Sequence, residues 1–268
     1  MSIHFYFCFL LYFKSYLYFA LEVFMSGHSK WATIKRKKAK TDVGRAKAWN
    51  KLIKEITIAA KLGGDNLDAN PRLRAAVLKA KGQSLPAKNI ESAISKAVGA
   101  NSSADMDEPI YEGRGPGGTA IMVTCMTDNK VRTVAEIRNI FNKNGGSMGE
   151  TGSVAWAFTY KGVILIDAQK YSEELIMDIV LEAGATDLNT EEGIHEVSTT
   201  LDSFESVTKA LEAKEIDMMN AELAYVPNDT VKLSSEDAQK LLKIIDKFED
   251  NDDVQDVYHN ADIDEKDL

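Results

Sequence analysis

The sequence predicts an α+β protein in which an N-terminal helical bundle precedes two α+β domains, the last of them ferredoxin-like and inserted in the middle one. Up to about residue 100, apolar residues recur with the three-to-four period of helices, whereas short β-rich runs alternate with helical segments beyond it. Charge changes at the same place, because the helical part is basic and the remainder acidic. With 268 residues and 44% hydrophobic content, the chain can bury two or three small cores.

The first 24 residues differ from everything that follows. They hold ten aromatic residues, and Lys14 and Glu22 are their only charged ones. The stretch is long enough to span a bilayer, but it lacks the positively charged start and the small-residue cleavage site of a signal peptide, and Lys14 lies near its middle. We favour a mis-assigned leader (1–24) over a membrane anchor and expect N-terminal sequencing of the native protein to begin at Met25 or Ser26.

Three helices are expected in a basic domain at residues 25–105. The first carries a long apolar stripe and ends at the glycine pair Gly63-Gly64. Asn70-Pro71 is typical of an N-cap followed by proline at the first helical position, so it begins the second helix. Pro86 begins the third helix and Gly99 ends it.

A middle domain is expected at 106–160 plus 229–268. The glycine-rich turn Gly113–Gly118 is followed by a second strand and not by a helix, which favours a tight hairpin over a dinucleotide-binding loop. We expect strands at 109–113, 119–127 and 154–160 and a helix at 130–144, with Val134, Ile137, Ile140 and Phe141 facing inward.

An inserted domain is expected at 161–228. Its elements follow the order β-α-β-β-α-β, which is the split βαβ arrangement of ferredoxin-like domains. The last helix (234–248) and a strand near 254–258 have no partner of their own, so we expect them to return to the middle domain. The strands of the insertion are placed at 163–166, 186–190, 194–199 and 220–226, and its helices at 172–183 and 203–213.

Candidate catalytic and metal-binding residues are few. Beyond the leader, Cys125 is the only cysteine, and it lies in an apolar run, so we expect its side chain to lie in the core. Because a single cysteine cannot form an internal disulfide, the sequence fits a reducing compartment. His28, His195 and His259 are scattered and form no recognisable motif with a nucleophile or a second metal ligand. We therefore expect no enzymatic activity, no cofactor, no metal and no small-molecule substrate.

Residues 25–98 contain thirteen Lys and four Arg against five acidic residues, a net charge of +12 that leaves −21 for the remainder of a chain whose total is −9. Such a domain attracts phosphate, and we favour nucleic-acid contact over a solvated helix face or a localisation signal because the asymmetry covers the whole domain. The expected nucleic-acid-binding residues are Lys30, Trp31, Lys35, Arg36, Lys37, Lys38, Lys40, Arg45, Lys47, Lys51, Lys54, Arg72 and Arg74. Arg114, Gly115 and Gly117 of the hairpin form a candidate second contact, although a tight turn by itself accounts for the glycines equally well.

Six short motifs carry a resemblance to a known family. They are Gly27-His28-Ser29-Lys30-Trp31, Leu52-Ile53-Lys54-Glu55-Ile56, Asn70-Pro71-Arg72-Leu73-Arg74-Ala75-Ala76, Tyr111-Glu112-Gly113-Arg114-Gly115-Pro116-Gly117-Gly118, Arg132-Thr133-Val134-Ala135-Glu136-Ile137-Arg138 and Gly152-Ser153-Val154-Ala155-Trp156. These motifs resemble those of the YebC/PmpR family of probable transcriptional regulatory proteins, which includes the mitochondrial translational activator of cytochrome c oxidase. The chain departs from the family pattern in its leader, in Arg114, where many members have an aromatic residue, and in Met148, where many have Leu.

The resemblance implies three domains with the last inserted in the middle one, and a cytoplasmic regulator that binds DNA. Other members act in translation, so the alternative is a ribosome-associated translation factor or translational activator that binds RNA. A module that recruits basic protein partners through its acidic domains is a third reading. We expect a monomer that associates with nucleic acid and not with membranes. No pair of helices shows base-reading side chains, so much of the binding is expected to be sequence-tolerant.

Overall fold

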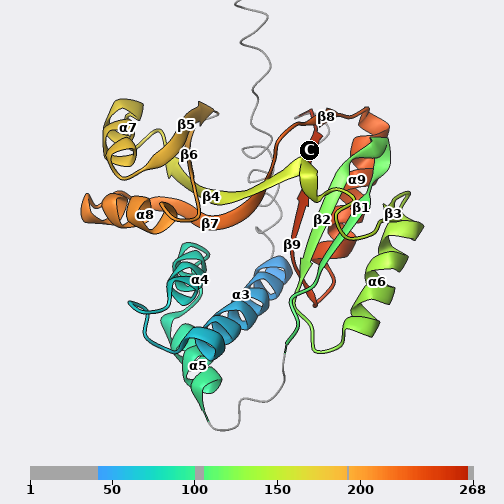
Figure 1. Ribbon diagram of the computed structural model, residues 1–268, viewed down its shortest axis with the longest axis horizontal. Helices are drawn as coiled ribbons and strands as arrows, with labels where there is room; N and C mark the ends of the chain where they lie inside the picture. The colour runs from blue at the N-terminus through green and yellow to red at the C-terminus, as the bar shows by residue number, and fades with distance from the viewer. Residues whose placement is uncertain (1–41, 100–105, 192, 265–268) are drawn as a thin grey trace, which may run out of the picture.

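The computed structural model describes residues 42–99, 106–191 and 193–264, apart from the side chains of residues 42–45. N-terminal helices are followed by two groups of strands and helices, each built on an antiparallel sheet (Figure 1). The protein is therefore an α+β protein, as the sequence predicts.

The three expected helices of the basic segment are confirmed. Asn70 caps the second of them, because its side chain accepts a hydrogen bond from the Leu73 N–H at 3.0 Å and donates to the carbonyls of Ala59 and Gly64 at 2.7 and 2.8 Å. One asparagine thus fixes the turn between two helices. Ile56 and Leu73 are fully buried in the core that these helices share. The helices are α3 (Asp42–Gly63), α4 (Pro71–Gly82) and α5 (Ala87–Val98).

The central sheet has the strand order β3-β1-β2-β9, and helices α6 and α9 cover one of its faces (Figure 1). Phe141 of α6 and Phe248 of α9 meet edge to face in the core beneath them, with ring centroids 4.8 Å apart. The strand Val254–His259 pairs with a strand more than 100 residues earlier, in the register Ile121↔His259. The elements are β1 (Ile110–Arg114), β2 (Ala120–Cys125), α6 (Lys130–Lys143), β3 (Ser147–Met148), α9 (Ser235–Glu249) and β9 (Val254–His259).

The second sheet has the strand order β5-β6-β4-β7, and α7 and α8 pack on one face. Along the chain its elements follow the order β-α-β-β-α-β. They are β4 (Phe158–Asp167), α7 (Glu173–Glu182), β5 (Ala185–Glu191), β6 (Ile194–Thr199), α8 (Phe204–Ala213) and β7 (Met218–Pro227).

The prediction of two separate strands at 154–160 and 163–166 is wrong. Residues Ala155–Ala157 form a 3-10 turn, and one strand, β4, then runs without a break from Phe158 to Asp167, so the domain boundary expected after Tyr160 falls inside it. Gly162 does not interrupt the strand. A Cβ at this position would lie 2.2 Å from Thr199 Oγ1 and 2.4 Å from Phe204, so glycine is there because the packing is close. The short β8 (Val231–Lys232) and β10 (Ala261–Asp262), which pair in parallel, were not predicted.

Candidate nucleic-acid interface

The predicted site residues divide into three groups. Lys30, Trp31, Lys35, Arg36, Lys37, Lys38 and Lys40 lie outside the described residues. Arg45 belongs to the α3 backbone, but its side chain is not described. The remaining ones are the α3 lysines Lys47, Lys51 and Lys54, the α4 arginines Arg72 and Arg74, and the hairpin residues Arg114, Gly115 and Gly117.

The α3 lysines recur at helical spacing and therefore share one side of the helix. Their ammonium groups all meet the segment 249–253 between α9 and β9, which we call the acidic turn because it contains Glu249, Asp250, Asp252 and Asp253. The contacts are from Lys47 Nζ to Asp250 Oδ1 at 2.7 Å, from Lys51 Nζ to the Glu249 carbonyl at 3.1 Å, and from Lys54 Nζ to the Asp252 carbonyl at 2.7 Å.

The acidic turn lies where the dipole of α9 is itself negative. Carboxylates at a helix C-terminus are unfavourable by on the order of 0.3–1 kcal/mol each, the converse of the stabilisation that cations give there. The lysines of α3 supply those cations from a distant part of the chain. The hydrogen bond from Lys47 lowers the pKa of Asp250, against the opposing effect of partial burial. The lysines of α3 thus compensate the negative charge at the C-terminal end of α9.

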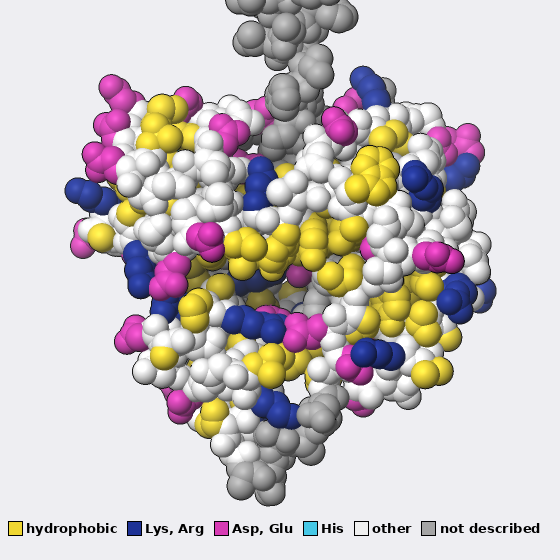
Figure 2. All heavy atoms as spheres, viewed as in Figure 1, with side chains coloured by type: hydrophobic (Ala, Val, Ile, Leu, Met, Phe, Trp, Pro, Cys, Tyr) yellow, Lys and Arg dark blue, Asp and Glu magenta, His cyan; other side chains and the backbone are white. Residues whose placement is uncertain are grey.

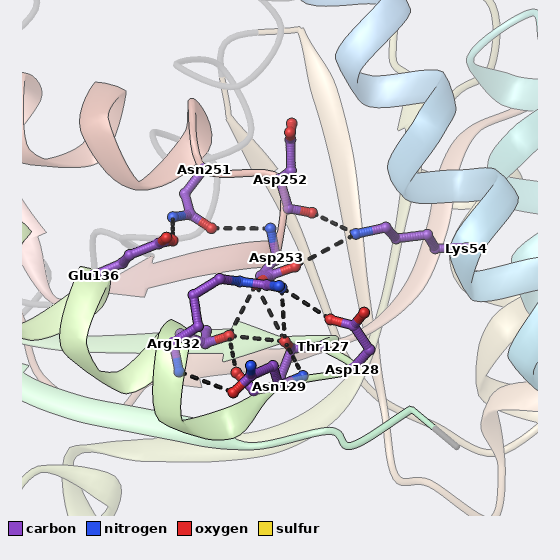
Figure 3. A network of polar contacts seen from close by, with 10 residues as sticks. Lys54, Thr127, Asp128, Asn129, Arg132, Glu136, Asn251, Asp252 and Asp253 are labelled. Carbon is purple, nitrogen blue, oxygen red and sulfur yellow. Dashed lines mark hydrogen bonds and ion pairs between the residues drawn. The ribbon is translucent and has the colours of Figure 1, made fainter. Parts of the chain in front are cut away.

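Asp253 is the centre of a polar network that joins three elements (Figure 3). Its Oδ2 accepts hydrogen bonds from Thr127 Oγ1 at 3.1 Å, Thr133 Oγ1 at 2.8 Å and Arg132 Nη2 at 2.8 Å. Its Oδ1 lies 3.8 Å from Lys54 Nζ. Burial raises the pKa of this carboxyl, but the hydrogen bonds from Arg132, Thr133 and Thr127 outweigh it and lower the pKa.

The same network anchors the start of α6 to the acidic turn. The Asn129 side chain caps α6 by accepting from the Arg132 N–H at 3.1 Å, and Asn251 Nδ2 donates to Glu136 Oε2 at 2.7 Å (Figure 3). This site was not predicted from the sequence, because only apolar residues of α6 were expected to face inward. Thr133 is fully buried, whereas Val134 is partly buried. Thr133 stands four residues before Ile137, on the same stripe, and that spacing is the signal that could have revealed it.

The α4 arginines also contact carboxylates. Arg72 bridges two of them, with Nε 2.8 Å from Glu55 Oε1 and Nη2 2.6 Å from Glu108 Oε2. Burial lowers the pKa of this guanidinium, but hydrogen bonds with Glu108 and Glu55 raise it above its usual range. Arg74 pairs with Glu205 of α8. Both side chains therefore connect the helical bundle to other parts of the protein in this conformation.

Lys79 was not among the predicted site residues, although it forms a largely buried ion pair between α4 and the sheets. Its Nζ lies 2.5 Å from Glu222 Oε2 on β7 and 3.6 Å from Asp256 Oδ2 on β9. Burial lowers its pKa, but the two carboxylates more than compensate and keep the pKa above the usual value. Next to it Ala75 and Leu78 pack against the core of the second sheet. Thus α4 holds the bundle to this sheet by apolar as well as charged contacts.

A central cavity of about 1470 Å³ lies between α3, α4 and the two sheets. Figure 2 shows this hollow, with apolar side chains along one rim and Lys or Arg beside Asp or Glu at its base. The ring of Tyr225 contacts two others, that of Tyr160 at a tilt of 38° and that of Tyr258 edge to face, with centroid distances of 4.7 and 5.5 Å. Because charges of both signs line the cavity, it does not by itself form an anion site.

The hairpin glycines have a structural explanation. At Gly117, φ is +68°, and a Cβ would lie 2.3 Å from Leu233 Cδ2; at Gly115 a Cβ would lie 2.6 Å from Ile121 Cδ1. The turn is therefore packed closely against its own domain. Arg114, at the end of β1, is exposed.

In residues 42–99, 106–191 and 193–264, no helix is long and apolar enough to cross a membrane. Within the same ranges, no cluster of three or more His, Cys, Asp or Glu side chains is arranged to hold a metal ion. Burial raises the pKa of the Cys125 thiol to about 12, which makes it a poor nucleophile.

Comparison with known proteins matches two family models to this chain. Residues 29–100 match the TACO1/YebC protein N-terminal domain, and residues 106–261 match the TACO1/YebC second and third domain. A "probable transcriptional regulatory protein" from Treponema denticola is 51% identical over 241 residues, which cover 90% of this chain and 98% of the relative. A protein of the same description from Syntrophobacter fumaroxidans is 50% identical over 240 residues, which cover 89% of this chain and 96% of the relative.

Among solved structures, the crystal structure of a conserved hypothetical protein, Aq1575 from Aquifex aeolicus, matches with a TM-score of 0.76 and 40% identity, covering 85% of this chain and 94% of that one. These matches extend over both the helical part and the sheets, and the family is one of non-enzymatic regulators. The chain belongs to the TACO1/YebC family of probable transcriptional regulatory proteins.

Proposed function

We propose that this protein is a DNA-binding transcriptional regulator of the cytoplasm whose helical domain supplies the phosphate contacts. The observation that carries the proposal is the separation of charge, +12 in residues 25–98 against −21 elsewhere. The printed description of the relatives, probable transcriptional regulatory protein, supports it. We also propose that the protein acts as a monomer.

The division of labour we propose follows three domains. The helical domain (25–105) binds nucleic acid, the middle domain (106–157 plus 228–268) carries the acidic turn, and the ferredoxin-like domain (158–227), bounded by the start of β4 and the end of β7, is inserted between the two parts of the middle one. Support for the insertion comes from the pairing of β9 with β2 and from the β-α-β-β-α-β order of the second sheet. Support for the binding role comes from the α3 lysines, which lie within two dozen residues of the basic run 30–40.

A ribosome-associated translation factor that binds RNA is the second candidate. The contacts available to Lys and Arg side chains on a phosphate backbone carry no sequence information and are alike for DNA and RNA. The matched family models name TACO1 together with YebC, and a translational activator is among the relatives that the sequence motifs resemble.

The experiment that tests the proposal is a binding titration with a DNA duplex and an RNA duplex at increasing salt. If the helical domain neutralises several phosphates, the log–log slope on DNA should be about −0.9 for each one, and a flat response would contradict the proposal. Replacing Lys35, Arg36, Lys37 and Lys38 with Ala should weaken binding to all sequences. The matched control replaces four exposed lysines of the other domains, Lys170, Lys209, Lys214 and Lys232, with Ala and should bind nearly as the parent does.

The choice between the two candidates depends on the cellular partner. Sedimentation of a cell lysate separates ribosomal particles from free protein. Co-sedimentation with ribosomal particles, lost on RNase treatment, would favour the translation factor. Free protein that binds the DNA duplex more tightly than the RNA duplex would favour the transcriptional regulator.

A further inference from the structure

We infer that the acidic turn is an intramolecular competitor for nucleic-acid phosphate at the α3 lysines, so that binding of the polyanion displaces the middle domain from the helical bundle. The inference deepens the proposed function, on which it rests, because it names a phosphate site within the basic domain and the element that controls it.

The row formed by Lys47, Lys51 and Lys54 has the dimensions of a phosphate-binding strip. Seven residues of helix separate its ends, which at 1.5 Å per residue gives roughly 10 Å. One strand of a duplex advances about 3.4 Å per phosphate along its axis, so the row matches about three phosphates. The lysines lie near the surface, since the side chains of Lys47 and Lys54 are 39% and 29% exposed.

The acidic turn occupies this row with the kind of atoms that a phosphate backbone would offer. The three ammonium groups each meet an oxygen, one from the Asp250 carboxylate and two from main-chain carbonyls, at 2.7 to 3.1 Å. Each contact requires only an oxygen acceptor at hydrogen-bonding distance, which a phosphate group also provides. The exposed ion pair between Lys47 and Asp250 contributes little net stability, and the other two contacts are hydrogen bonds whose acceptors are neutral carbonyls, so a dense row of phosphates can replace all three contacts.

The way the bundle is held determines which part moves. The core of the bundle and the core beneath α6 and α9 share no residue, and the contacts we find between α3 and the acidic turn are polar. By contrast, Ala75 and Leu78 of α4 pack against the core of the second sheet. The two sheets are joined by a core to which Met122 and Tyr258 of the central sheet and Ala224 of the second sheet contribute. When phosphate replaces the turn, the bundle should therefore stay on the second sheet, while the central sheet pivots about that core and its acidic turn moves away from α3, with loss of the Lys79–Asp256 and Arg72–Glu108 pairs.

The test begins with the affinity of a turn variant for the DNA duplex. Asp250→Asn combined with Asp252→Asn removes two exposed charges, and because Asp250 is the C-cap of α9, the loss of a negative charge there does not oppose helix formation. The matched control is Glu173→Gln with Glu174→Gln on α7, which changes the net charge equally. We expect the turn variant to bind about threefold more tightly than the control, a change typical of removing weak exposed pairs.

A distance measurement separates displacement from a general charge effect. Spin labels are placed at three exposed apolar positions, Leu62 on α3, Val131 on α6 and Leu175 on α7. On addition of the DNA duplex, the distance from 62 to 131 should lengthen and that from 62 to 175 should stay unchanged. Of the two native cysteines, Cys125 is buried and should not be labelled, and Cys8 is replaced with Ala in every labelled protein.

The outcomes distinguish the inference from the function it rests on. Tighter binding by the turn variant, together with the lengthened 62–131 distance, supports both. Equal affinities of turn variant and control, or an unchanged 62–131 distance in a protein that binds DNA, overturn the competitor and leave the proposed function standing. A parent protein that binds neither duplex at any salt concentration removes the proposed function, and the inference falls with it.

Discussion

Replacing Lys79 with Met removes the ammonium that joins α4 to β7 and β9 but keeps an unbranched side chain of similar length. The carboxylates of Glu222 and Asp256, 5% and 18% exposed, would then lose the cation that lies 2.5 and 3.6 Å from them. Breaking a buried ion pair by removal of one partner costs about 3–5 kcal/mol. Because 19% of the Lys79 side chain is exposed, we expect a loss near the lower end, about 3 kcal/mol.

The assay is urea unfolding followed by circular dichroism at pH 7, with two matched variants. Lys79→Ala also removes about three methylene-sized groups, so it should cost roughly 2 kcal/mol more than Lys79→Met. Lys79→Met combined with Glu222→Gln removes the more buried of the two uncompensated charges and should recover part of the loss, by about 0.5–3 kcal/mol of coupling between neighbouring groups. If the free energy of unfolding of Lys79→Met lies within 1 kcal/mol of the parent's, the reasoning is refuted, because Glu222 and Asp256 then do not depend on the Lys79 ammonium.

Three further outcomes are expected. Ile56→Asp places a carboxylate in the fully buried stripe of α3 and should destabilise the helical domain by several kcal/mol, seen as a lower melting temperature, whereas a change to Val should cost only about 1 kcal/mol. Asp253→Asn should cost about 2 kcal/mol at pH 7, as expected for hydrogen bonds to a charged group. The pKa of Asp253 is lowered in the folded protein, so this contribution is complete above its ordinary pKa of about 3.9 and is lost as pH falls through the folded value; a difference from the parent that does not shrink as pH is lowered below about 3.9 would contradict it. Gly117→Ala, at φ +68° and against Leu233, should cost about 1–3 kcal/mol in a thermal melt and leave the salt dependence of DNA binding unchanged, and an altered slope would instead indicate a phosphate contact at the hairpin.

The helices and most strands could be predicted because their signals are local. The cap at Asn70 and the glycine turn before β2 each depend on residues a few positions apart, and the charge difference between the two parts of the chain follows from composition alone. The prediction divided β4 into two strands on either side of residues 161–162, where Gly162 lies. Glycine has the same appearance in a sequence whether it ends a strand or admits a close neighbour, and here the neighbour is Phe204, 42 residues away.

The sequence by itself determined which residues of α3 are cationic and that they line one side of a helix. Only the tertiary structure decided what they meet, because Lys47 and Asp250 are 203 positions apart and become neighbours through the docking of one domain on another. The same holds for Asp253 with Thr133 and for Lys79 with Glu222. Helical period is a property of neighbouring residues, whereas the partner of a charge depends on how separately formed cores pack together, and no local pattern in the chain encodes that arrangement.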